Sequence, residues 1–63
     1  MKHNLEKYLN TLMLTKEVNI TRLNIDEIIK LVAKARKLGY ILDYKHDLSE
    51  KLYLVIKGKQ GEQ

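Results

Sequence analysis

The chain has 63 residues, a formal net charge of +4 and a sequence pI near 9.4. A chain of this length forms one small domain. It contains no cysteine, which excludes a disulfide framework, thiol catalysis and a cysteine-based zinc finger. No apolar run approaches the roughly 20 residues of a membrane helix. Because no secretory signal pattern follows Met1, we expect a cytoplasmic protein.

Stability is the first constraint on so short a chain. Hydrophobic residues make up 44%, enough for a core, but at this size apolar burial and conformational entropy nearly cancel. Either the elements form well locally or a partner completes the core. A homodimer is therefore one open alternative.

A helix is predicted for residues 4–16, followed by a strand over residues 17–22. Asn4 is a suitable N-cap, and Glu6 in the first turn favours the helix dipole. The apolar residues at helical spacing are Leu5, Tyr8, Leu9, Leu12 and Met13. In the next segment β-branched Val18 and Ile20 alternate with polar residues, which is typical of a strand.

The second helix, residues 25–38, has the strongest local signals. Asn24 and Glu27 form a capping-box pair, and Gly39 stands where a left-handed C-cap residue is expected. Lys34, Arg36 and Lys37 in the last turn suit the helix C-terminus. Its predicted apolar face consists of Ile25, Ile28, Ile29, Leu31, Val32 and Ala35.

The remaining residues predict a β-hairpin with strands 40–45 and 51–57. Alternation places Tyr40, Leu42, Tyr44, Leu52, Leu54 and Ile56 on one face, and this requires an odd-numbered loop of three or five residues. We expect one α+β domain over residues 1–57, with αβαββ order and both helices on one face of a three-stranded sheet. Residues 58–63 lack apolar side chains and are predicted to be a disordered tail.

Two resemblances follow from this pattern. Asn24-Ile-Asp-Glu-Ile-Ile-Lys30, Leu38-Gly-Tyr-Ile-Leu-Asp-Tyr44 and Leu52-Tyr-Leu-Val-Ile-Lys57 resemble the N-terminal half of the eighth protein of the bacterial small ribosomal subunit. The resemblance implies the αβαββ topology. The family's Val-Pro is absent, and its RNA-contacting second domain has no counterpart here, so no RNA-binding residue is carried over. The order of elements is also similar to a winged-helix DNA-binding domain, with two helices instead of three. Size and charge likewise resemble phage or plasmid accessory proteins.

Basic residues predict a nucleic-acid interface. Lys30, Lys34 and Lys37 lie at i, i+4 and i+7 on the polar face of the second helix, with Arg36 at its edge. Like charges at this spacing weaken a helix, so phosphate contact is one reading and a solvated helix face the other. Lys45 and Lys51 near the hairpin tip could assist as a wing does, although lysines also protect sheet edges from aggregation. We expect binding to duplex DNA, with RNA as a further alternative.

A second hypothesis is a regulatory protein-binding module that docks on a larger DNA-acting enzyme such as a recombinase. Ile41, Tyr53 and Val55 are predicted to form a patch on the outer sheet face, suited to a partner protein. We expect no enzymatic activity, no catalytic residue, no metal and no cofactor. Ser49 is the only serine, and no glycine-rich phosphate loop is present. Asp43, His46 and Asp47 in a solvated turn lack the surroundings that a metal site needs.

Overall fold

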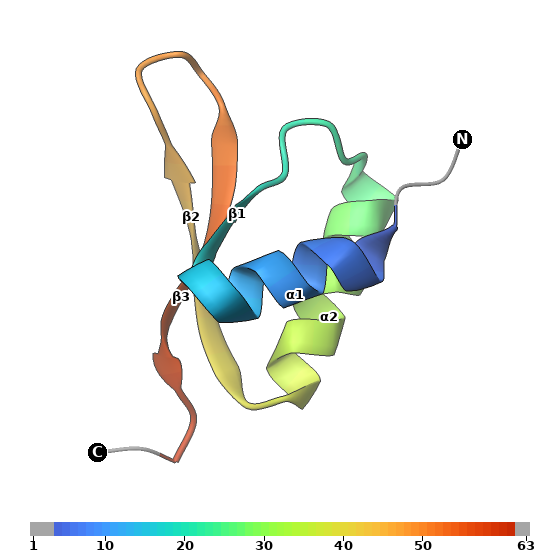
Figure 1. Cartoon of the computed structure of the whole chain (residues 1–63), viewed down its shortest axis with the longest axis vertical. Helices are drawn as coiled ribbons and strands as arrows, with labels where there is room; N and C mark the ends of the chain where they lie inside the picture. Colours follow the sequence, from blue (N-terminus) through green and yellow to red (C-terminus); the bar gives the residue numbers. More distant parts are fainter. Residues whose placement is uncertain (1–3, 62–63) are drawn as a thin grey trace.

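A computed structural model describes residues 4–61, which fold into two helices and a three-stranded antiparallel sheet. The elements in chain order are α1 (Leu5–Thr15), β1 (Glu17–Asn19), α2 (Ile25–Lys37), β2 (Tyr40–His46) and β3 (Leu52–Lys59) (Figure 1). The predicted α+β class and the αβαββ order are confirmed.

The ends of α1 are fixed by its flanking residues. Asn4 is the N-cap, and its side chain accepts a hydrogen bond from the Lys7 amide. Lys16 follows the last turn in the left-handed conformation, with a φ of 68°, and donates its amide to the Leu12 carbonyl at 2.8 Å. Because a lysine here replaces the usual glycine, α1 stops at some conformational cost.

The predicted capping box of α2 is confirmed. The Asn24 side chain accepts the Glu27 amide at 2.8 Å, and the Glu27 carboxylate accepts the Asn24 amide at 3.1 Å. Gly39 has a φ of 92°, which a residue without Cβ adopts readily. The helix therefore reverses directly into β2.

The sheet has the strand order β1-β3-β2, so β3 is central and β1 and β2 are edges. Val18 and Tyr44 both oppose Leu54, and Leu42 opposes Ile56, which confirms the predicted faces. Five residues, 47–51, connect β2 to β3, in agreement with the predicted odd loop. A register shift follows Ile41, because Leu42 pairs with Ile56 whereas Ile41 pairs with Gly58.

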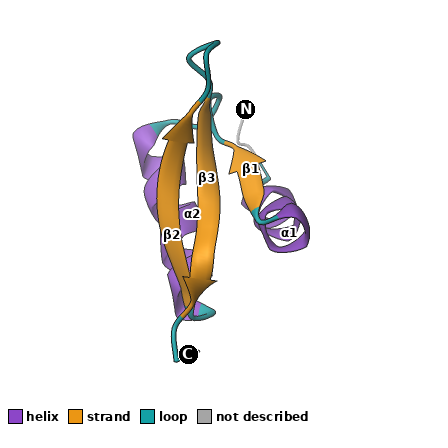
Figure 2. Cartoon of the chain, turned by 90° about the vertical axis from the view of Figure 1, so that its left-hand side faces the viewer, coloured by secondary structure: helices purple, strands orange, loops and turns teal. Residues whose placement is uncertain are grey.

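Viewed from the outer side of the sheet, α2 lies behind β2 and β3, and α1 is seen end-on beside β1 (Figure 2). Among residues 4–61, eight apolar residues are buried between the two layers, and four of them are fully enclosed: Leu12 of α1, Ile20 after β1, Leu31 of α2 and Leu54 of β3. Removing these side chains from water is the main stabilising contribution.

Three predictions about the elements need correction. The first strand ends at Asn19 rather than at residue 22, because Thr21 begins a turn in which its amide donates to the Asn19 side chain at 2.9 Å. The predicted apolar face of the second helix is too wide. Ile25 and Ile29 are 71% and 60% exposed, since only the side of α2 around Leu31 and Ala35 meets the core.

The predicted disordered tail is also wrong for its first residues. Gly58 and Lys59 belong to β3, where they oppose Ile41 and Tyr40, and the Gln60 amide donates to the Gly39 carbonyl. Backbone pairing with β2 extends the strand without any apolar side chain. The last two residues of the predicted tail, 62–63, lie outside the described part of the chain.

Neither of the helices described is long and apolar enough to cross a membrane.

Candidate nucleic-acid interface

The predicted cations of α2 separate into two groups. Lys30, Lys34 and Lys37 share one flank, and Lys34 reaches Glu6 of α1 at 3.1 Å, so this flank borders α1. Arg36 lies on the other side of the exposed face and lines a cavity of about 330 Å³ with the first residues of β2. Arg36 therefore belongs to the β2 end of the molecule.

The structure does not bring the two predicted hairpin cations to the α2 surface. Lys45 lies on the outer sheet face, where its ammonium nitrogen is 3.2 Å from the Glu17 carboxylate and 5.4 Å from the centroid of the Tyr53 ring. Lys51 instead lines a cavity next to α1 and β1. The six predicted nucleic-acid contacts are thus distributed over separate surfaces.

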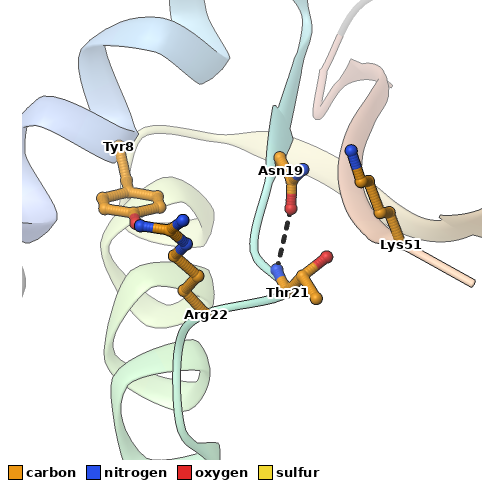
Figure 3. Close-up of a pocket in the computed structure, with 5 residues that line it drawn as sticks. All are labelled: Tyr8, Asn19, Thr21, Arg22 and Lys51. Carbon is orange, nitrogen blue, oxygen red and sulfur yellow. Dashed lines mark hydrogen bonds between the residues drawn. The ribbon is translucent and has the colours of Figure 1, made fainter.

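The cavity next to Lys51, also about 330 Å³, adds Arg22, a cation that sequence reasoning missed (Figure 3). Its other lining residues are Tyr8, Asn19 and Thr21. The Asn19 side chain already accepts the Thr21 amide, and the Thr21 hydroxyl accepts the Leu52 amide at 2.9 Å. The Asn19 and Thr21 side chains are thus already hydrogen-bonded to the backbone. Arg22 and Lys51 are the charged residues that line this cavity.

Four cations surround Tyr40 at the other end of the sheet. Two cavities meet at this tyrosine: the one lined by Arg36, and one of about 130 Å³ lined by Lys16, Lys57 and Lys59. We call these five residues the Tyr40 surface. They come from the end of α1, the end of α2, the start of β2 and the end of β3, which only the tertiary fold assembles.

Two of these cations are held in place by identifiable contacts. The Lys59 stem lies against Gly39, where an added Cβ would be 3.9 Å from Lys59 Cγ and Cε. Its ammonium nitrogen is 5.9 Å from the centroid of the Tyr40 ring, within the range of a cation–π contact. The Lys16 carbonyl accepts the Ile56 amide at 2.8 Å, which anchors its backbone to β3.

Charge balance differs between the Tyr40 surface and the rest of the molecule. Glu6, Glu17 and Asp43 pair with Lys34, Lys45 and Lys57, respectively. Within residues 4–61, Lys16, Arg36 and Lys59 form no ion pair. Of the four cations of the Tyr40 surface, Lys57 is paired with Asp43, and the other three leave a net positive potential around Tyr40.

The predicted patch of Ile41, Tyr53 and Val55 does lie on the outer sheet face. Val55 opposes Glu17 on one side and Asp43 on the other, and Tyr53 lies between Asn19 and Lys45. Tyr53 and Val55 are half-buried under these polar neighbours, and Ile41 is about half exposed. The apolar area is thus narrow and bordered by two ion pairs, Lys45–Glu17 and Lys57–Asp43.

Across residues 4–61, no three histidine or acidic side chains come together in an arrangement that could hold a metal ion. Comparisons with protein-family models, with curated proteins and with solved structures found no match to this chain. The functional assignment therefore depends on the charge and geometry described above.

Proposed function

We propose that this protein is a small non-enzymatic accessory protein that binds nucleic acid, and duplex DNA in the first instance, through the Tyr40 surface and the adjoining cations of α2. The observation that supports the proposal most is the gathering of Lys16, Arg36 and Lys59 around Tyr40 without an acidic partner among residues 4–61. Lys37 in the last turn of α2 and Lys30 one turn before Lys34 extend the positive charge along the helix.

The chemistry of these residues suits the nucleic-acid backbone. Lysine and arginine bind phosphate oxygens and release counterions, which supplies most of the affinity of non-specific binding. Within α2 the cation-bearing turns contain no asparagine or glutamine that could read a base edge. Any preference among duplex sequences therefore comes from DNA shape or from a partner.

Binding to labelled duplex DNA, single-stranded DNA and a structured RNA across a salt series tests the proposal. On duplex DNA, the logarithm of the binding constant should fall with the logarithm of salt concentration, by about 0.9 for each phosphate contact. Lys59→Gln and Arg36→Gln should each weaken binding to all duplex sequences and reduce the slope. Lys45→Gln removes the same charge from a lysine already paired with Glu17 and is the matched control. The proposal fails if all three variants behave alike.

A second candidate function is a regulatory module that docks on a larger DNA-acting enzyme, as phage and plasmid accessory proteins do. The observation in its favour is that the register of the sheet places Ile41, Tyr53 and Val55 on one face, opposite the face that carries Leu42 and Leu54. Tyr53→Ala and Val55→Asp should then abolish complex formation, whereas Lys59→Gln should not. Retention of the complex in both outer-face variants would remove this face from the interface.

A further inference from the structure

The strand β2 has a free edge whose hydrogen-bonding groups can be assigned. The Ile20 amide donates to Leu52 and the Ile56 amide donates to Lys16, so Leu52 and Ile56 of β3 face β1. Antiparallel strands alternate these directions, so Tyr53 and Val55 bond to β2 through their register partners Lys45 and Asp43. The backbone groups of Leu42, Tyr44 and His46 consequently point away from the sheet.

The contacts of Tyr44 agree with this assignment. Its amide donates to the carboxylate of the preceding residue, Asp43, at 2.8 Å, rather than to β3. The free edge thus presents one amide that is satisfied only by a local and exposed side chain. Such a group exchanges its partner readily when another strand arrives.

A flank of α2 with two exposed isoleucines and the partly buried Val32 lies on the same side of the molecule. Ile25, Ile29, Val32 and Arg36 follow at i, i+4, i+7 and i+11 on one side of α2. Arg36 lines a cavity with Tyr40, Ile41 and Leu42, so this side of the helix faces β2. Tyr44 is 52% exposed on the helix-facing side of β2. The surface on this side of the molecule thus comprises the free edge of β2 and the flank of α2 that carries Arg36 and the exposed isoleucines.

We propose that this surface binds a second copy of the chain, with the two β2 strands paired antiparallel about a twofold axis at Tyr44. In this register Tyr44 opposes the partner's Tyr44, and Leu42 opposes the partner's His46. All of these residues have outward-pointing backbone groups, so the hydrogen bonds of the two strands match. The two sheets join into one of six strands, with both α2 helices on the same face.

Charge selects this register among those that match the hydrogen bonds. With Tyr44 on the axis, Asp43 opposes the partner's Lys45, and Lys45 opposes the partner's Asp43. These are non-hydrogen-bonded pairs, whose side chains approach most closely in an antiparallel ladder. If the axis were at Asp43 or at Lys45 instead, that residue would oppose the same residue of the partner, and the two like charges would repel each other. The sequence of β2 is thus complementary to itself in one register.

The hairpin tip supports the same arrangement. Leu48 is fully exposed in the connection between β2 and β3. It lies four residues beyond the axis, as Tyr40 lies four residues before it. Antiparallel pairing therefore brings Leu48 of one copy next to the Tyr40, Ile41 and Leu42 side of the other, where these three residues line a cavity together with Arg36 and Gln60.

This proposal does not depend on nucleic-acid binding, and its test uses the protein alone. Sedimentation equilibrium of the full chain, from micromolar to near-millimolar concentration, should give twice the monomer mass of 7.4 kDa. Asp43→Lys and Lys45→Asp should each reduce the mass to that of the monomer, because each creates two repulsive pairs across the axis. An equimolar mixture should recover the dimer mass, because the mixed pair has both attractive contacts.

Circular dichroism of each variant establishes that it is folded, and the mixture provides a readout that a folding defect cannot imitate. The chain has no cysteine, so Tyr44→Cys supplies a single thiol at the axis, and mild oxidation should cross-link it to a disulfide dimer. Lys30→Cys, on the opposite flank of α2, should not cross-link. A wild-type monomer at all concentrations, or a mixture that stays monomeric, overturns the proposal.

Discussion

Lys45 of β2 and Glu17 of β1 form an ion pair of 3.2 Å that spans the central strand and links the two edges of the sheet. The Lys45 ammonium group also lies over the Tyr53 ring of β3. Both side chains are about half exposed, so the pair contributes little to stability. It does neutralise Lys45, which the sequence alone predicts to contact nucleic acid.

A double-mutant cycle of Lys45→Gln and Glu17→Gln measures this relationship. We expect a coupling energy of about 0.2–1 kcal/mol, the range of solvated ion pairs. Urea unfolding of the four proteins supplies the values. A coupling above that range would mean that the pair is better shielded from water than its exposure indicates.

The loop residue Glu50 offers a stabilising substitution. It has a φ of 63°, and the Glu50 amide donates to the Asp47 carbonyl in a tight turn. Glycine adopts this conformation without the steric cost of a Cβ, although it also increases the entropy of the unfolded chain. Glu50→Gly should raise the free energy of unfolding by up to about 1 kcal/mol. The neighbouring Ser49→Gly, where φ is not positive, should lower it instead.

The capping box of α2 makes a separate contribution. Asn24→Ala removes the acceptor of the Glu27 amide and should lower the free energy of unfolding by about 1 kcal/mol. Asn24→Ser restores a capping oxygen and should recover most of the loss. Thermal unfolding followed by circular dichroism distinguishes the three proteins. Equal stability of the alanine and serine variants would show that the cap is dispensable.

Asp47 should make the hairpin loop sensitive to acid. The Lys51 amide, with a smaller contribution from the Ser49 amide, donates to its carboxylate and lowers the pKa of Asp47 below its ordinary value of 3.8. Because the folded-state pKa is the lower one, the stabilisation is complete above the ordinary value and disappears as the pH falls through the folded pKa.

The matched variant is Asp47→Asn, which retains an oxygen acceptor but does not titrate. Urea unfolding at neutral pH and at a pH well below 3.8 should show wild type more stable than the variant at neutral pH only. A difference that is the same at both pH values would mean that the charge of Asp47 has no role in the loop.

Local sequence rules predicted the parts of the fold that depend on neighbours in the chain. Asn24, Glu27 and Gly39 define α2 because caps act within a few residues. The period of two fixed the faces of β2 and β3 and the odd loop. In contrast, the sequence did not predict that Lys59 belongs to a strand. Backbone pairing with Tyr40 orders this residue, and no alternation of apolar side chains around it indicates a strand.

The candidate site was only partly predictable. Arg36 was found from its place on α2, but its neighbours Lys16 and Lys59 come from elements far apart in the sequence, and pairing along the sheet brings them together. The helical spacing also predicted Ile25 and Ile29 on the apolar face of α2, yet both are mostly exposed. An apolar helix position indicates burial, without saying whether the core or another molecule covers it.

The most direct test of the central claim is the salt dependence of duplex DNA binding by wild type, Lys59→Gln and Lys45→Gln. We predict that Lys59→Gln lowers the slope by about 0.9, the value of one phosphate contact, and weakens binding at every salt concentration. Lys45→Gln should leave the slope unchanged. Wild-type binding that disappears near physiological salt, or identical slopes for all three proteins, would contradict a nucleic-acid interface around Tyr40.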